Sequence, residues 1–249
     1  MSEPFLIRYL QPLLGGRRSE CFNLICDALE TGWAAERLVQ DVVWPAMAQV
    51  DRLYRDDRIN AAVENMACRI NRTVADQLQA HLPKRPPNGK CVLVACVAEF
   101  GEELGAQMVA DLFQADGWQV YFIGGSVPHD ELLSMVGELR PHVLLLFGAG
   151  PQAVPVVRGL IDLIRDIGVC PTMNIMLSGG SFNRVDGLWR EVGADAFAGS
   201  AHDVLALANE LPLREPNAPR LGIVKKRRRR RRRTAPKPQL ETARTPARL

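Results

Sequence analysis

Residues 91–125 read CVLVACVAEFGEELGAQMVADLFQADGWQVYFIGG. In this stretch an apolar run at 91–97 is followed by a segment with helical spacing at 103–116 and by a second apolar run at 120–123. Short apolar runs alternating with helical segments are typical of a parallel sheet with right-handed helical crossovers. The stretch therefore predicts an α/β fold.

The same alternation continues to residue 211. Further strand–helix pairs are expected at 120–123 with 130–139, 143–147 with 154–167, 174–177 with 184–192, and 194–198 with 203–211. Five such units predict a parallel sheet that is covered by helices on both faces. Gly117, Gly168 and Gly193 each stand just before an expected strand, where glycine commonly ends a helix.

The segments on either side of this domain have different patterns. Apolar residues at spacings of three and four predict a bundle of about four helices over residues 1–82. Three prolines and a glycine make residues 83–90 a linker, and the α/β domain then covers 91–212. Residues 213–249 lack the apolar content needed to fold alone, which predicts a disordered tail.

Charge divides the chain in the same way. The formal net charge is +3, but residues 221–249 carry +11 and the remaining 220 residues carry −8. A run of cations in the tail could contact nucleic-acid phosphates, dock on an acidic protein or anionic membrane, or remain solvated. Because no aromatic residue interrupts the run, any nucleic-acid binding would be nonspecific. The run consists of Lys225, Lys226, Arg227, Arg228, Arg229, Arg230, Arg231, Arg232 and Arg233.

Several classes of protein are excluded. No stretch reaches the roughly 18 consecutive apolar residues of a membrane span, and the N-terminus lacks the pattern of a secretory signal. The six cysteines form no CxxC pair, which predicts buried thiols of a cytoplasmic protein and neither disulfides nor a zinc site. No nucleophilic triad or metal cluster is evident, so the residues alone do not predict an enzyme.

Four loops follow the expected strands at the edge where open parallel sheets bind ligands. They are residues 98–105, 124–128, 148–150 and 178–180, and each contains glycine, which permits close backbone approach to a ligand. Tight-turn chemistry is the alternative for any one loop, but four at one edge favour a binding crevice. The first loop is neither a dinucleotide fingerprint nor a P-loop. Its carboxylates, Glu99 and Glu102, are better explained as residues at a helix N-terminus than as an acid–base pair.

A helical bundle followed by this domain resembles the cobalamin-binding module of methionine synthase, corrinoid methyltransferase proteins and cobalamin-dependent photoreceptor regulators. The resemblance covers residues 17–211 and implies a flavodoxin-like sheet in the order 2-1-3-4-5. Residues 54–65 stand where the photoreceptors carry Trp-x9-Glu-His over the upper corrin face, and 102–105 where the superfamily carries His-x-x-Gly. Residues 124–128 match Gly-x-x-Val-Pro, and 179–180 match a Gly-Gly pair beside the nucleotide tail.

The resemblance implies cobalamin as the cofactor and also shows departures. Glu102 replaces the lower cobalt ligand, a histidine, and carboxylate is a poor substitute for imidazole. Two histidines lie at the ligand edge, where solvated loop positions are the alternative. No side chain is assigned to the metal itself. The implied cofactor-binding residues are Tyr54, Glu64, Asn65, Glu99, Glu102, Gly105, Gly124, His129, Gly148, Ser178, Gly179, Gly180 and His202.

The resemblance is strongest to stand-alone antirepressors of photosynthesis genes. We therefore expect a regulatory or sensory protein that binds a corrinoid without the usual lower histidine. It would act through a partner transcription repressor or through nucleic acid. Two alternatives are a corrinoid carrier for methyl transfer and a degenerate interaction module that no longer binds cobalamin. The sequence does not decide whether the chain forms oligomers.

Overall fold

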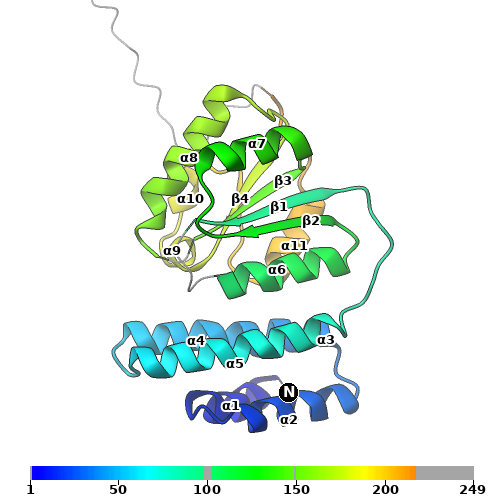
Figure 1. Ribbon diagram of the computed structural model, residues 1–249, viewed down its shortest axis with the longest axis vertical. Coiled ribbons are helices and arrows are strands. Elements are labelled where there is room, and N and C mark those ends of the chain that lie inside the picture. The colour runs from blue at the N-terminus through cyan, green and yellow to red at the C-terminus, as the bar shows by residue number, and fades with distance from the viewer. Residues whose placement is uncertain (1, 98–102, 149, 217–249) are drawn as a thin grey trace, which may run out of the picture.

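The computed structural model describes residues 2–97, 103–148 and 150–216. Its helical N-terminal part lies as a cap against one side of an α/β domain (Figure 1). Of the predicted tail, residues 213–216 are described and, contrary to the prediction, Arg214 is held by the folded domain, whereas residues 217–249, including the Lys225–Arg233 run, lie outside the described residues. Within the described part, no helix combines the length and the apolar character needed to cross a bilayer.

The cap contains four helical rods, in agreement with the predicted bundle. One rod is composite, because a π-helical turn connects two α-helices within it. Pro45 follows this turn with only Trp44 between them. Proline lacks an N–H group and crowds the preceding turn, and a π-helical turn is a local adjustment that accommodates such a break. The bounds are α1 (Ser2–Leu14), α2 (Arg18–Glu30), α3 (Ala35–Leu38), η1 (Val39–Val43), α4 (Trp44–Arg55) and α5 (Ala61–Gln79).

The α/β domain contains five parallel strands in the order β2-β1-β3-β4-β5, which confirms the predicted sheet. Helices α6 and α11 cover the face turned to the cap, and α7 to α10 cover the opposite face (Figure 1). The strands are β1 (Cys91–Cys96), β2 (Gln119–Gly124), β3 (Val143–Phe147), β4 (Asn174–Ser178) and β5 (Ala196–Phe197). The helices are α6 (Glu103–Ala115), α7 (His129–Leu139), α8 (Ala153–Ile167), α9 (Gly180–Arg184), α10 (Leu188–Glu191) and α11 (Ala201–Glu210).

The last strand–helix units differ from the prediction. The helix expected over 184–192 is reduced to α10 at Leu188–Glu191, and the separate short helix α9 ends at Arg184, because Val185 is extended and Gly187 has a φ of +76°. The last strand pairs only through Ala196 and Phe197, whereas five residues were expected to be extended. The spacing of apolar residues predicts neither the break in the helix nor the short pairing of the last strand, since both depend on the backbone angles of single residues.

The cap and the α/β domain share one hydrophobic core. Trp44 of α4 packs edge-on against Phe147 of β3, with ring centroids 6.2 Å apart. Deeper in the cap, the Tyr9 hydroxyl donates a hydrogen bond of 2.8 Å to the Asn71 side chain, which satisfies the phenol in a buried position. A second core lies between the other face of the sheet and α7 to α10.

The carboxylate of Asp195 holds the end of the described chain against the sheet. It accepts hydrogen bonds from the Ile175 amide at 2.7 Å and from Arg214 Nε at 3.0 Å, and it pairs with the nearly buried Arg165. The Arg214 amide also donates to the Thr172 carbonyl at 3.0 Å. Residues 211–216 are therefore fixed beside the amino end of β4.

The linker between the cap and the sheet is fixed to the end of α6. The Arg85 amide donates to the Ala115 carbonyl at 3.0 Å, and the Asn88 amide donates to the Gly117 carbonyl at 2.9 Å. Gly117 has a φ of +86°, and a Cβ added there would lie 2.1 Å from the Pro86 carbonyl oxygen. Glycine is therefore required at Gly117 both by its backbone angle and by the neighbouring chain.

We predict that Gly117→Ala lowers the free energy of unfolding by about 3 kcal/mol or more, because backbone strain and a clash with fixed backbone add together. Gly32→Ala is the matched control, since Gly32 has a φ of +90° but nothing within 4 Å of an added Cβ. The control should lose only the roughly 1–2 kcal/mol of left-handed strain. Urea unfolding of both variants measures the difference, and equal losses would contradict the proposed clash.

Candidate cofactor cleft

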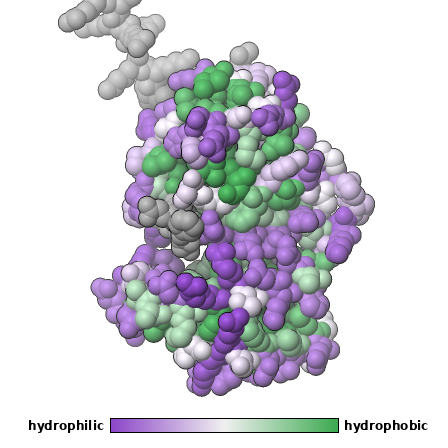
Figure 2. Space-filling view, in the orientation of Figure 1, coloured by the Kyte–Doolittle hydropathy of each residue, from purple (hydrophilic) through white to green (hydrophobic). Residues whose placement is uncertain are grey.

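A cavity of about 510 Å³ lies between the cap and the carboxyl end of the sheet. Its volume is in the range of small-molecule sites. Figure 2 shows the surface hollowed where the cap meets the α/β domain. The cap contributes Trp44, Met47, Ala48, Asp51, Arg52, Arg55, Glu64 and Cys68, and the α/β domain contributes Leu104, Gly105, Phe147, Gln152, Gly179, Gly180, Asn183 and Arg184.

Glycines allow the closest packing in the floor of this cleft. A Cβ added to Gly105 would lie 2.6 Å from Phe147 Cζ and 3.3 Å from Met47 Cε. Gly179 has a φ of +106°, and a Cβ added there would lie 2.9 Å from the Gly148 carbonyl oxygen. The start of α6 and the end of β4 therefore approach their neighbours closely only because no side chain is present.

Glu103 connects two of the predicted glycine loops, a role that the sequence did not indicate. Its Oε1 accepts a hydrogen bond of 2.9 Å from the Gly125 amide. A Cβ added to Gly124 would lie 2.9 Å from the same oxygen. The carboxylate at the start of α6 thus positions the loop that follows β2.

The roof of the cleft contains two carboxylates and a thiol. Glu64 and Cys68 are one turn apart on α5, and Asp51 comes from α4. Burial raises the pKa of Glu64, and the nearby Asp51 carboxylate raises it further. Burial likewise raises the pKa of the Cys68 thiol, with a smaller contribution from Glu64. The roof therefore favours the neutral forms of Glu64 and Cys68.

Polar contacts hold the cap over the cleft. Arg184 Nη1 lies 3.9 Å from Asp51 Oδ2, and the same Asp51 oxygen accepts a hydrogen bond of 3.0 Å from Arg55. Gln40 Nε2 lies 3.3 Å from His202 Nδ1 at the start of α11. Partly exposed ion pairs contribute little to stability, so these contacts orient the cap more than they bind it.

Several predicted residues occupy other positions. Tyr54 and Asn65 are exposed and are not among the described lining residues, and the Asn65 amide donates to the carbonyl of Ala61 in its own helix at 2.9 Å. His129 is exposed at the start of α7, and His202 contacts the cap. Glu99 and Glu102 lie outside the described residues. Cofactor contact by these six residues stays a prediction.

A buried hydroxyl lies directly behind the floor, at a residue that does not itself line the cleft. Ser178 is 0% exposed, and its Oγ has no hydrogen-bond partner among the described residues. Neighbouring side chains in a strand point to opposite faces, and Met176 of the same strand packs in the core on the cap side. Ser178 therefore faces the cap side, directly before the Gly179–Gly180 turn. An unsatisfied buried hydroxyl costs free energy that a ligand atom could recover.

Taken with the glycine floor, this arrangement suits a large ring with polar arms. Trp44, Met47 and Phe147 provide apolar surface for a macrocycle. Amide and guanidinium groups at the rim, such as Asn183 and Arg55, suit amide arms and a phosphate-bearing tail. The described residues thus fit a corrinoid.

The two parts of the chain match two family models, both described as B12 binding domain, over residues 7–79 and 90–208. The chain belongs to the B12-binding domain superfamily. Cobalamin or a related corrinoid is therefore the cofactor of this fold, as predicted. The two matched ranges lie on opposite sides of the cleft. The cap and the α/β domain are therefore both parts of the B12-binding module.

Individual relatives are corrinoid proteins. Dimethylamine corrinoid protein 3 of Methanosarcina acetivorans is 23% identical over 180 residues, covering 72% of this chain and 83% of that protein. Dimethylamine corrinoid protein 1 of the same organism is 26% identical over 110 residues, covering 44% of this chain and 50% of that protein. The solved monomethylamine corrinoid protein of Methanosarcina barkeri has a TM-score of 0.72 at 18% identity, over 84% of this chain and 98% of that one, and shows the same fold.

These relatives correct the expected function. The prediction of a sensory antirepressor that acts on transcription through a partner repressor is wrong, because the relatives are dimethylamine corrinoid proteins. Nothing in them supports a nucleic-acid partner. Of the three residues that stand where the photoreceptors carry Trp, Glu and His, only Glu64 lines the cleft, whereas Tyr54 and Asn65 do not. The alternative of a corrinoid carrier agrees with the relatives.

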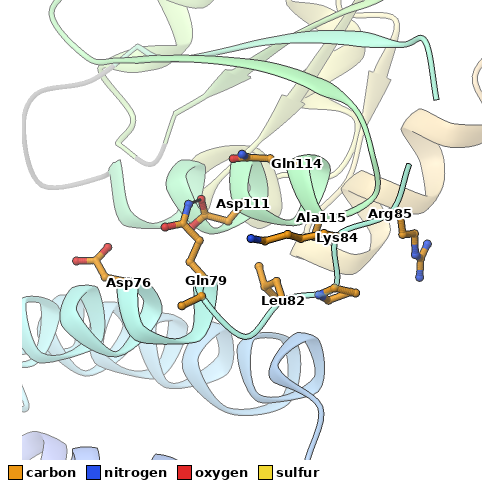
Figure 3. Close-up of a pocket in the computed structure, with 10 residues that line it drawn as sticks. Asp76, Gln79, Leu82, Lys84, Arg85, Asp111, Gln114 and Ala115 are labelled. Carbon is orange, nitrogen blue, oxygen red and sulfur yellow. Dashed lines mark hydrogen bonds between the residues drawn. The ribbon is translucent and has the colours of Figure 1, made fainter. Parts of the chain in front are cut away.

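A second cavity, of about 460 Å³, lies beside the linker and outside the cobalamin cleft. Figure 3 shows Gln79 and Asp111 meeting between α5 and α6, with Lys84 extending toward them from the linker. Gln79 Nε2 donates to Asp111 Oδ1 at 2.7 Å, and Gln107 Nε2 donates to Asp76 Oδ1 at 2.7 Å. Burial, and then the nearby Asp76 carboxylate, raise the pKa of Asp111 to about 6.

This shift predicts a pH effect on stability. The folded protein binds the Asp111 proton more tightly than the unfolded chain does, because the folded pKa is about 6 and the unfolded value is about 4. Its stabilising contribution is therefore complete below about pH 4 and is lost as the pH rises through 6.

Asp111→Asn should consequently raise the free energy of unfolding at pH 8, relative to wild type, by about 1 kcal/mol after allowance for solvent screening. An asparagine oxygen can keep the Gln79 hydrogen bond. The gain should disappear near pH 4, which urea unfolding at the two pH values will show. A gain that is equal at both would contradict the assigned titration.

Proposed function

We propose that this chain carries a corrinoid for methyl transfer and works with a methyltransferase partner. The observation that carries the proposal is the closed arrangement of cap, cleft and glycine floor in a chain whose relatives are dimethylamine and monomethylamine corrinoid proteins. By analogy with the names of these relatives, methylamines are the class of methyl donor to test first. The substrate and the partner are part of the proposal.

In this proposal the floor and the rim hold the cofactor. Gly105 and Gly179 leave backbone at the floor, and Ser178 donates its hydroxyl to a polar atom of the tail. Asn183 and Arg55 meet polar arms at the rim. When bound, the corrinoid supplies a cobalt that accepts and donates a methyl group.

The chain's own contribution is a controlled environment above the ring. Trp44 and Met47 in the roof, with Phe147 opposite, exclude water from the centre of the cleft. Burial raises the pKa of Glu64 and the pKa of the Cys68 thiol, which disfavours the anionic form of each in the roof. Apolar surface at the centre of the roof suits a carrier whose upper face has to remain open to a small group.

The first test is cofactor retention. We expect the purified protein to co-elute from gel filtration with hydroxocobalamin or methylcobalamin and to show a corrin visible spectrum. Gly105→Ala should weaken binding by about tenfold or more, because an added Cβ pushes Phe147 into the cleft.

Gly159→Ala is the matched control, since Gly159 is also a helical glycine but has nothing within 4 Å of an added Cβ. It should bind cobalamin like the wild type. If wild-type protein retains neither corrin, in the dark or after light, the carrier proposal is overturned and the degenerate-module alternative stands.

A second test addresses the lower face. The resemblance of residues 102–105 to His-x-x-Gly places Glu102 where the superfamily carries the lower cobalt ligand. Glu102→His should therefore introduce a histidine-ligated visible spectrum, because imidazole nitrogen is a better donor to cobalt than carboxylate oxygen. Glu138→His, at an exposed position of α7 that does not line the cleft, is the control and should leave the spectrum unchanged. Identical spectra for the two variants would contradict the alignment of residues 102–105 with His-x-x-Gly.

A further inference from the structure

One residue of the cleft, Met47, extends from the roof toward the floor. It belongs to α4, which lies in the layer of the cap nearest the sheet (Figure 1). Trp44 and Asp51 line the cleft from the same side of this helix, because they are three and four residues away from Met47. Met47 Cε lies 3.3 Å from the position that a Cβ on Gly105 would take. The end of the Met47 side chain therefore reaches the glycine floor.

A ring held between the roof and the floor requires Met47 to turn aside. Carbon atoms in contact lie about 3.5–4.0 Å apart, and a ring needs such a contact on each of its faces. The gap between Met47 Cε and Gly105 is smaller than this, since even a single carbon added to Gly105 would lie 3.3 Å from Cε. Methionine is unbranched and has three rotatable bonds, so its side chain adapts readily to a new neighbour.

The helix that carries Met47 is held in place by its other contacts. Ala46 and Val50 of α4 are buried in the core that the cap shares with the sheet, and Trp44 packs edge-on against Phe147 of β3. Because protein cores are close-packed, withdrawing α4 from the floor would open voids at these contacts. The space above a bound ring is therefore adjusted through the Met47 side chain and not through the backbone of α4.

Other roof residues are less able to yield to a ligand. Trp44 would lose its contact with Phe147. Asp51 accepts a hydrogen bond of 3.0 Å from Arg55 and lies 3.9 Å from Arg184 across the cleft, so moving it would break polar contacts. The apolar contacts of Met47 are not directional, and its side chain can be displaced at a smaller cost.

We propose that Met47 sets the size of the group that the upper face of the bound corrinoid carries. Its displaced side chain leaves room for a hydroxyl or methyl group and crowds a longer alkyl chain. Met47 is then a size filter that selects one-carbon groups. The inference rests on the proposed function and deepens it, because it names a residue that restricts what the carrier accepts.

Cobalamins that differ only in the upper group test the size filter. Their affinities are measured in the dark by equilibrium dialysis with visible absorbance, which requires no methyltransferase. The wild type should bind hydroxocobalamin and methylcobalamin with similar affinity. It should bind n-propylcobalamin at least about tenfold more weakly, because overpacking a well-packed apolar site is unfavourable.

Met47→Ala removes the side chain beyond Cβ and leaves space for the longer alkyl group. Its affinity for n-propylcobalamin should come within about twofold of its affinity for methylcobalamin. Met66→Ala is the matched control, since Met66 is an exposed methionine of the neighbouring helix α5 that lies against Gly16 and is not among the described lining residues. It should discriminate between the two corrins like the wild type.

Met47→Leu is a second variant that keeps an apolar side chain of similar volume in the cap, a change that cores tolerate well. Leucine is shorter than methionine, so its reach toward the floor is reduced. Its discrimination against n-propylcobalamin should fall between those of the wild type and Met47→Ala. Thermal melts establish that each variant is folded.

The outcomes separate this inference from the carrier proposal. If the wild type binds all three corrins equally, the size filter is overturned and the carrier proposal stands. If folded Met47→Ala and Met47→Leu discriminate as strongly as the wild type, the assignment to Met47 is overturned. If the wild type binds none of the three, the carrier proposal fails and the size filter fails with it.

Discussion

The edge-on contact between Trp44 and Phe147 is the interaction on which the rest of the structure depends. Phe147 ends the central strand β3, and its ring also limits how closely the first turn of α6 can approach. The same ring therefore fixes the cap, the start of α6 and one wall of the cleft. The Phe147 ring also requires glycine at position 105, because it occupies the space that a side chain of Gly105 would need.

The parallel sheet and most helices could be predicted from the sequence, since buried strands are short apolar runs and helices show three-and-four spacing. The glycines of the floor were also predicted, because their positions after strands reflect a local backbone requirement. Neither the π turn before Pro45 nor the break at Gly187 was predicted. Both depend on the backbone angles of individual residues, and the spacing of apolar residues carries no information about those angles.

The roof of the cleft was the least predictable part of the site. Asp51 meets Arg184, which is 133 positions away in the chain, only because the cap docks on the sheet. The sequence could have grouped Cys68 with Glu64 in one site, since both lie on one face of α5. The wall of the cleft that faces them belongs to the α/β domain, and spacing along α5 does not reveal it. A motif aligned by spacing placed Asn65 in the site, whereas in the structure its amide bonds to its own helix.

The Asp195 anchor has a practical consequence. By fixing residues 211–216 beside the amino end of β4, it determines where a tether joined after residue 216 would leave the folded protein. The cleft opens at the carboxyl ends of the strands, the opposite end of the sheet. A molecule captured on a sensor surface through such a tether would therefore present its cleft outward, toward the solution.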